Sequence, residues 1–246
     1  MRTAYRVLSV VTLLFFSPIL QSGNGLMAGA LKKKPRTISL VKKSEEFEAR
    51  VGKLYCDANL DEAGLSREAF EYAYIGYLRL LEQHRIQKSN VLTICDFSQS
   101  SRRKRFYIID LEEMKLLVNT YVAHGRNSGG EFAKSFSNSP ESHKSSLGFY
   151  RTLQPYYGEH GLSLRIGGLE RGINDRADRR NIVIHGSEYI GDNFIQSNPF
   201  AGRSYGCPAL PSNEIDEVVN TIKDGTCLFI YHPTKNYIKK SKILNA

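Results

Sequence analysis

A histidine and a cysteine lie near each other in the last third of the sequence, each in a setting that suits chemistry. His185 ends the apolar run that starts at Asn181, and Cys207 ends a short segment that contains Gly206. The run predicts a buried strand with His185 at its tip, and the glycine predicts a turn that presents the thiol. A cysteine attacks as the thiolate, which is scarce at neutral pH unless an imidazole takes the proton. The pair therefore predicts a nucleophile and its general base.

The residues around the cysteine suit an oxyanion site. Gly206 removes a side chain beside the thiol, and Pro208 fixes the chain direction after it. The backbone N–H groups of Tyr205, Gly206 and Cys207 are therefore expected to approach a substrate carbonyl and to stabilise the charge that develops on it. Two roles stay open for Ser204, a specific hydrogen bond in the turn or simple loop stabilisation. Tyr205 either contacts substrate or shields the site.

These motifs resemble the signature of the murein L,D-transpeptidase catalytic domain family, the YkuD-like cysteine transpeptidases of peptidoglycan metabolism. The segment 145–150 is similar to the Thr-Pro-x-Gly-x-Phe strand of the family, and residues 105–125 are similar to its opening hairpin, so the likeness covers about residues 91–233. The resemblance implies an L,D-transpeptidase-like β-sandwich with Cys207 as the nucleophile and His185 as the base. It also implies that the backbone carbonyl of Gly186 orients the base.

Two positions depart from the family pattern. Many members have His where this chain has Tyr205, and many have Arg two residues after the cysteine, where this chain has Ala209. The missing Arg leaves the contacts to a substrate carboxylate undefined. The missing His does not remove the base, because that role maps to His185.

The resemblance implies an exported cysteine acyltransferase that acts on peptidoglycan stem peptides. The donor would be a stem tetrapeptide cleaved before its terminal D-residue, and the thioester would pass to an amine of a neighbouring stem. If water intercepts the thioester, the same site is an L,D-carboxypeptidase or an endopeptidase. A non-catalytic cell-envelope binding module is the alternative from another class, and Tyr205 and Ala209 motivate it. No cofactor is expected, because nucleophile and base are both protein groups.

Several other side chains compete for a role. His124 is followed by Gly125, as His185 is by Gly186, and is therefore a competing base. Zinc bound by Cys207, His185 and His124 is a further alternative, but the sequence has no paired Cys-x-x-Cys or His-Glu-x-x-His spacing, and no metal is expected. Three arginines could pair with a substrate carboxylate or form ordinary salt bridges: Arg165, Arg171 and Arg203.

The N-terminus predicts export. Two arginines, an apolar run from Val7 to Leu20 and a small-residue stretch ending at Ala30 are typical of a signal peptide, and the run is short for a membrane span. We therefore expect residues 1–30 to be a signal peptide, residues 31–89 a tether and helices, and residues 90–246 the catalytic domain. A retained anchor is the alternative, but no stable membrane span is expected after cleavage. The mature protein would be periplasmic or secreted.

The composition favours a folded domain with a basic surface. Of 246 residues 41% are hydrophobic, and the net charge falls from +9 to about +7 without Arg2 and Arg6. Solvated basic patches or attraction to an anionic envelope polymer explain this charge, whereas nucleic acid does not, because no binding motif appears. The four cysteines leave disulfide pairing open, with Cys56–Cys95 as one possible bridge and Cys227 as a buried thiol. The oligomeric state is not predicted.

The periodicity of apolar residues predicts helices before residue 90 and mostly strands after it. Helices are expected over 44–55, 66–84 and 212–224, the last one following the cysteine closely. Phe70, Tyr74 and Tyr77 form a packing stripe on the second helix, with Ser66 as its cap. Strands are expected over 91–97, 105–111, 115–124, 147–153, 163–167, 181–185 and 226–231. The Ser-rich segment 126–146 is long for a loop and therefore suggests a functional role.

Overall fold

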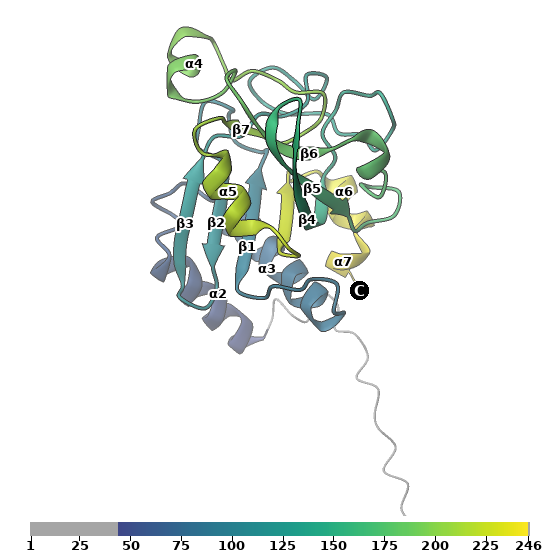
Figure 1. Ribbon diagram of the computed structural model, residues 1–246. Coiled ribbons are helices and arrows are strands. Elements are labelled where there is room, and N and C mark those ends of the chain that lie inside the picture. The colour runs from purple at the N-terminus through teal and green to yellow at the C-terminus, as the bar shows by residue number, and fades with distance from the viewer. Residues whose placement is uncertain (1–43, 246) are drawn as a thin grey trace, which may run out of the picture. The chain divides into compact units, whose positions relative to one another are not determined.

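The computed structural model describes residues 44–245 (Figure 1). The predicted signal peptide and residues 31–43 of the predicted tether lie outside the described residues. Residues 44–245 belong to one compact unit, so the helices that precede residue 90 lie in the same unit as the strands that follow it. Within residues 44–245, no helix combines the length and the apolar character needed to cross a membrane.

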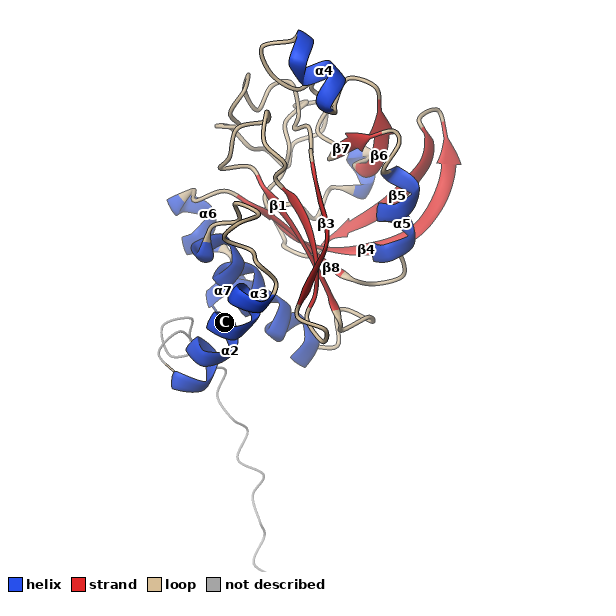
Figure 2. Ribbon diagram, turned by 90° about the vertical axis from the view of Figure 1, so that its left-hand side faces the viewer, coloured by secondary structure: helices blue, strands red, loops and turns tan. Residues whose placement is uncertain are grey.

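Eight strands are joined by hydrogen bonds into one sheet with the order β3-β2-β1-β8-β4-β5-β6-β7. The pairs β1–β8 and β6–β7 are parallel, and the other neighbours are antiparallel. Figure 2 shows that the sheet twists strongly and that the long β4–β5 hairpin curves away from the other strands. The predicted mainly β fold is confirmed. The strands are β1 (Val91–Asp96), β2 (Phe106–Asp110), β3 (Lys115–Thr120), β4 (Gly148–Gly158), β5 (Gly161–Gly168), β6 (Val183–Ser187), β7 (Ala209–Pro211) and β8 (Cys227–Tyr231).

Helices cover both sides of this sheet. Figure 2 shows α2, α3 and α7 on one side and α5 on the other. The apolar face of α5 is buried, as predicted from its periodicity. The described helices are α2 (Glu45–Asp57), α3 (Arg67–Glu82), α4 (Asp192–Ser197), α5 (Ile215–Ile222), α6 (Lys235–Lys240), α7 (Lys242–Asn245) and the short 3₁₀ helix η1 (Asp178–Arg180).

Helix α3 begins and packs as its sequence predicts. The Ser66 hydroxyl oxygen accepts a hydrogen bond from the Ala69 N–H at 3.2 Å, which caps the first turn. The rings of Tyr74 and Tyr77 stack 5.8 Å apart in the predicted aromatic stripe. The close approach of α3 to the sheet depends on Gly76, because a Cβ atom there would lie 1.9 Å from the ring of Phe149.

Some elements differ from the prediction, and their hydrogen bonds explain why. Strand β3 ends at Thr120 rather than at residue 124, because the chain turns to pair Ala123 with Ala209. Strands β4 and β5 extend beyond the predicted bounds as a long hairpin. Strand β7 and helices α4, α6 and α7 were not predicted, since each is short. The C-terminal helices are held by the buried Glu170 carboxylate, which accepts from Tyr237 at 3.0 Å and from Ser241.

All four cysteines are free thiols. The considered Cys56–Cys95 bridge is not formed: Cys56 is exposed on α2, whereas Cys95 is buried in β1. Cys227 is buried in β8, in agreement with its apolar surroundings in the sequence. Cys207 is therefore not blocked by a disulfide.

Candidate active site

The structure holds His185 in a defined orientation on β6. This strand lies between β5 and β7, where His185 pairs with Ser163 on one side and with Ala209 on the other. The imidazole is almost completely buried, and its Nδ1 atom lies 2.9 Å from the Gly186 carbonyl oxygen. A carbonyl oxygen can only accept, so Nδ1 carries the hydrogen and Nε2 keeps the lone pair that a base needs.

The surroundings of His185 keep the imidazole neutral. Burial lowers the pKa of His185 below its usual range, although the hydrogen bond to Gly186 raises it in part and the nearby His160 lowers it further. The ring is therefore unprotonated at neutral pH. This is the protonation state in which it can accept a proton.

Cys207 lies on the turn that leads into β7, next to the start of β6. Its Sγ atom is 3.5 Å from the Asn181 carbonyl oxygen, to which the thiol donates, and 3.5 Å from the Val183 N–H, from which it accepts. Burial raises the pKa of the Cys207 thiol, while the Val183 N–H and the charge of Arg180 oppose this rise. The resting thiol is therefore protonated and is held by the backbone at and just before the start of β6.

The sequence predicts a thiol and an imidazole within reach of each other, and the structure places both against β6. Parallel pairing puts His185 opposite Ala209, two residues after Cys207, and Val183, which contacts the sulfur, lies two residues before His185. Among residues 44–245, the hydrogen-bond partners of the sulfur are Asn181 and Val183 rather than the imidazole. Such contacts often tighten only when substrate binds.

The turn before Cys207 is closed by Ser204. Its hydroxyl donates to the Cys207 carbonyl oxygen at 2.6 Å and accepts from the Gly206 N–H at 3.0 Å. The expected set of three oxyanion donors is thereby reduced, because the Gly206 N–H is already engaged. The N–H groups of Tyr205 and Cys207 have no recorded acceptor among the described residues and are the remaining donors.

A glycine is required at position 206 for two reasons. Its φ of +125° lies in the region that disfavours side chains. A Cβ atom there would also lie 2.9 Å from the Lys144 carbonyl oxygen and 3.1 Å from the Arg180 guanidinium. The turn can therefore pack against the Ser-rich loop only without a side chain at this position.

Two residues at the site were missed by the sequence analysis. His160, at the tip of the β4–β5 hairpin, stacks on His185 with ring centroids 4.5 Å apart. Arg180, five residues before His185 in the chain, donates to the carbonyl oxygens of Ser137 (2.9 Å) and Lys144. His160 comes to the site only through the curvature of the hairpin, which no local pattern reveals. Arg180 lies just before the strand that carries His185, and this closeness in the sequence could have indicated that it belongs to the site.

His124, the competing base, is tied into the structure. Its Nδ1 atom accepts from the Arg105 guanidinium at 2.8 Å, and its Nε2 atom lies 3.4 Å from the Gly129 carbonyl oxygen. Burial, with the neighbouring Arg105 charge, lowers the pKa of His124 to about 3. Both ring nitrogens are thus engaged with protein groups, which is the bonding pattern of a structural histidine.

Acidification should therefore destabilise the protein through His124. The pKa of His124 is lower in the folded state than in the unfolded chain, so its contribution to stability is complete above pH 6.5 and is lost as the pH falls toward 3. Between pH 7 and pH 5 this loss should be about 2 kcal/mol. Urea unfolding of the wild type and of His124→Gln at both pH values tests this. Between pH 7 and pH 5 the free energy of unfolding should fall by about 2 kcal/mol more in the wild type than in the variant. An identical pH dependence in both proteins would show that His124 does not titrate in this way.

The three arginines proposed for substrate binding are not gathered together. Arg165 stacks on Tyr156 at 5.0 Å and lines a cavity of about 250 Å³ that Asn181 and Val183, the two thiol partners, also line. Arg203 donates to the Gly129 carbonyl oxygen at 3.2 Å and stacks on Phe200. Arg171 is exposed in the loop after β5. Arg165 therefore shares a cavity with the backbone that holds the thiol.

The alternative of a zinc site requires a cluster of metal-binding side chains. No group of three or more His, Cys, Asp or Glu side chains suited to a metal is found among residues 44–245. His124 directs its two ring nitrogens to Arg105 and Gly129, not to the thiol.

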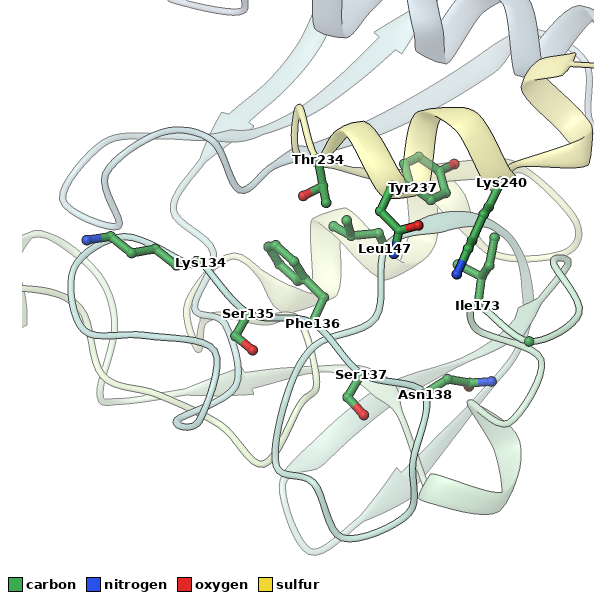
Figure 3. A pocket seen from close by; sticks show the side chains of 12 residues that line it. Lys134, Ser135, Phe136, Ser137, Asn138, Leu147, Ile173, Thr234, Tyr237 and Lys240 are labelled. Carbon is green, nitrogen blue, oxygen red and sulfur yellow. The ribbon is translucent and has the colours of Figure 1, made fainter.

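A further cavity, of about 310 Å³, lies between the Ser-rich loop and α6 (Figure 3). Figure 3 shows Phe136 and Leu147 in the middle of it, with Tyr237 and Lys240 contributed by α6. Ser137 links this cavity to the site, because it lines the cavity while its carbonyl oxygen accepts from Arg180. The cavity contains neither the thiol nor the imidazole.

The site thus combines a buried histidine on β6 with a cysteine on a glycine-containing turn, within a mainly β domain of eight strands. The family model for the L,D-transpeptidase catalytic domain matches residues 61–231, well over half of the chain. The chain therefore belongs to the L,D-transpeptidase catalytic domain family.

Solved structures of L,D-transpeptidases are similar to parts of this chain. An L,D-transpeptidase from Mycobacterium smegmatis is 12% identical with a TM-score of 0.36 over 58% of this chain and 59% of that one. One from Mycobacterium tuberculosis is 13% identical with a TM-score of 0.35 over 58% of each chain. One from Xylanimonas cellulosilytica is 12% identical with a TM-score of 0.34 over 73% of this chain and 93% of that one. The chain thus spans less than two thirds of the first two proteins. No curated protein matches it.

Proposed function

We propose that this protein is an exported cysteine acyltransferase that acts on peptidoglycan stem peptides by L,D-transpeptidation. The observation that carries the proposal is the hydrogen bond of 2.9 Å between His185 Nδ1 and the Gly186 carbonyl oxygen. It leaves Nε2 unprotonated on the strand that also holds the Cys207 thiol. Membership of the L,D-transpeptidase catalytic domain family supports the reaction class and the substrate class.

The first half of the reaction forms a thioester. His185 Nε2 takes the thiol proton as Sγ attacks the carbonyl carbon before the terminal D-residue, and the carbonyl oxygen gains the negative charge. The N–H groups of Tyr205 and Cys207 stabilise that oxyanion. The C–N bond then breaks, the imidazolium returns its proton to the leaving amine, and the acyl group stays on Cys207.

The second half transfers the acyl group. An amine of a neighbouring stem peptide loses a proton to His185 and attacks the thioester carbon, so a cross-link forms and the thiol is regenerated. Water in place of the amine gives hydrolysis, which makes the same site an L,D-carboxypeptidase or an endopeptidase. The protein groups described above suffice for each step.

The N-terminal sequence supports the cellular place of this reaction. Residues 1–30 have the charge, apolar run and small residues of a signal peptide, and peptidoglycan lies outside the cytoplasmic membrane. In this proposal residues 31–43 are a tether, and residues 90–246 carry the catalytic site, with α2 and α3 packed on the sheet.

The experiment is incubation of the purified protein with disaccharide tetrapeptide muropeptides, alone and with an added amine acceptor, followed by mass spectrometry. The proposal predicts cross-linked products with the acceptor and tripeptides where water competes, and neither product with Cys207→Ala. Tripeptides alone would assign the carboxypeptidase activity. Muropeptides left intact but retained by both proteins would reject catalysis and favour the non-catalytic binding module.

A further inference from the structure

An arginine, a tyrosine and a histidine stack beside the candidate nucleophile. The Arg126 guanidinium lies over the Tyr205 ring at 4.6 Å, and the His143 ring lies 4.6 Å from the same ring. Arg126 Nη2 is 3.0 Å from His143 Nδ1, and because a guanidinium only donates, the imidazole nitrogen accepts. We call these three residues the Arg126 platform.

The backbone holds the platform in place before any ligand arrives. The Arg126 N–H donates to the Ser204 carbonyl oxygen at 2.8 Å, which fixes Arg126 next to Tyr205. The Asn127 N–H donates to the His143 carbonyl oxygen at 3.1 Å, which brings the Ser-rich loop to the same place. His143 has a φ of +51°, a left-handed conformation that is uncommon for a residue with a side chain. The two ends of the Ser-rich loop and the turn before Cys207 are therefore tied together at this point.

The chemistry of the platform suits an anion. Arg126 is exposed, and none of the ion pairs recorded within residues 44–245 includes it. A guanidinium has five N–H donors in a planar fork. Within the described residues, the hydrogen bond of the Arg126 side chain to His143 uses one of these donors. Stacking on Tyr205 fixes the plane of this fork. A planar, fixed and unpaired guanidinium recognises a carboxylate through two parallel hydrogen bonds.

The position of the platform indicates which carboxylate it meets. Tyr205 is two residues before Cys207 on the same turn, and its backbone N–H is one of the two remaining oxyanion donors, so we expect the platform to border the place where the leaving residue sits. When a peptide is cleaved before its last residue, the carboxylate of that residue is only one residue away from the reacting carbonyl, roughly 4 Å along the chain. An anion at that distance lies in the neighbourhood of Tyr205.

We propose that Arg126, held over Tyr205 and by His143, binds the C-terminal carboxylate of the donor peptide and so selects donors that end one residue after the cleaved bond. This inference rests on the proposed function for its donor. It adds a binding group and a specificity that the site residues named above do not supply. Arg165, which stacks on Tyr156 in the same manner, is the rival for this carboxylate.

Binding measurements in the Cys207→Ala background test the inference, because no turnover then occurs. The probes are a synthetic stem tetrapeptide that ends in D-alanine and the same peptide with a C-terminal carboxamide, titrated by calorimetry. We expect the acid to bind about 10-fold more tightly than the amide, as a charge-assisted hydrogen bond at an exposed site would give. Adding Arg126→Gln should lower the affinity for the acid to that for the amide. Arg126→Lys should restore part of the difference, and Arg165→Gln should preserve it.

Other results would overturn the inference. They are equal binding of acid and amide by Cys207→Ala, an unchanged preference after Arg126→Gln, loss of the preference through Arg165→Gln instead, or no binding of either peptide. Matching alkylation rates of Cys207 in wild type and in Arg126→Gln establish that this substitution leaves the thiol site intact. The proposed function is judged separately by muropeptide turnover, so a failure of the inference can be distinguished from a failure of the proposed function.

Discussion

Replacing Cys207 with alanine should reduce muropeptide turnover by at least about 10⁴-fold, because the reaction then has no nucleophile. The residual rate would come only from binding and from the oxyanion donors, which the substitution leaves in place. Steady-state product formation, followed by chromatography and mass spectrometry, measures the effect. Removing one of the other thiols is the matched control.

Cys56→Ala supplies that control, because Cys56 is an exposed free thiol on α2. It should leave the rate within about twofold of the wild type, as expected for a surface substitution. A Cys207→Ala protein that keeps more than a tenth of the wild-type rate would reject the thioester reaction. A large loss in Cys56→Ala would point to a different nucleophile.

Replacing His185 with alanine should lower kcat/KM by about 10²-fold to 10⁴-fold, the usual contribution of a positioned general base. The pH profile gives an independent readout. His185 acts unprotonated, and burial lowers its pKa, so the rate should fall only as the pH drops through a value below 6.5. In this mechanism the proton that His185 passes to the leaving amine comes from the Cys207 thiol, so loss of that proton at high pH should lower the rate. Because burial raises the pKa of the thiol, this alkaline fall should begin above the ordinary range of a cysteine.

His160 and His124 provide contrasting controls for this profile. His160 lowers the pKa of His185, so His160→Gln should move the acid limb toward higher pH while preserving the general base. His124→Gln should leave the acid limb in place, because His124 is bonded to Arg105 and Gly129. An acid limb that disappears in His124→Gln and persists in His185→Ala would show that His124, and not His185, is the general base.

The sequence predicts the main secondary structure because its periodic signals are strong. The Ser66 cap of α3 and the apolar faces of α3 and α5 are local features, and both helices form within the expected ranges. The predicted ends of β3 and β4 are wrong, because these ends depend on pairing partners far along the chain. The chain stops pairing with β2 after Thr120, and Ala123 pairs with Ala209 instead. The β4–β5 hairpin continues as far as its two strands can pair with each other.

In the candidate site, too, local features could be predicted and contacts between distant segments could not. The residues next to each other in the chain, from His185 to Gly186 and from Ser204 to Cys207, could be predicted from motifs. The hydrogen bond that engages the Gly206 N–H could not, since either role of Ser204 fits the sequence. His160, Arg180 and Arg126 come from three other segments and meet only through the curvature of the sheet and the packing of the Ser-rich loop.

The central claim is that Cys207 carries the acyl group during the reaction. Intact-protein mass spectrometry after mixing with a stem tetrapeptide and rapid acid quenching tests it most directly. The account predicts a mass increase equal to the donor without its terminal residue, located on the peptide that contains Cys207, released by hydroxylamine and absent from Cys207→Ala. Turnover without such an adduct, or an adduct on Cys56, Cys95 or Cys227, would contradict it.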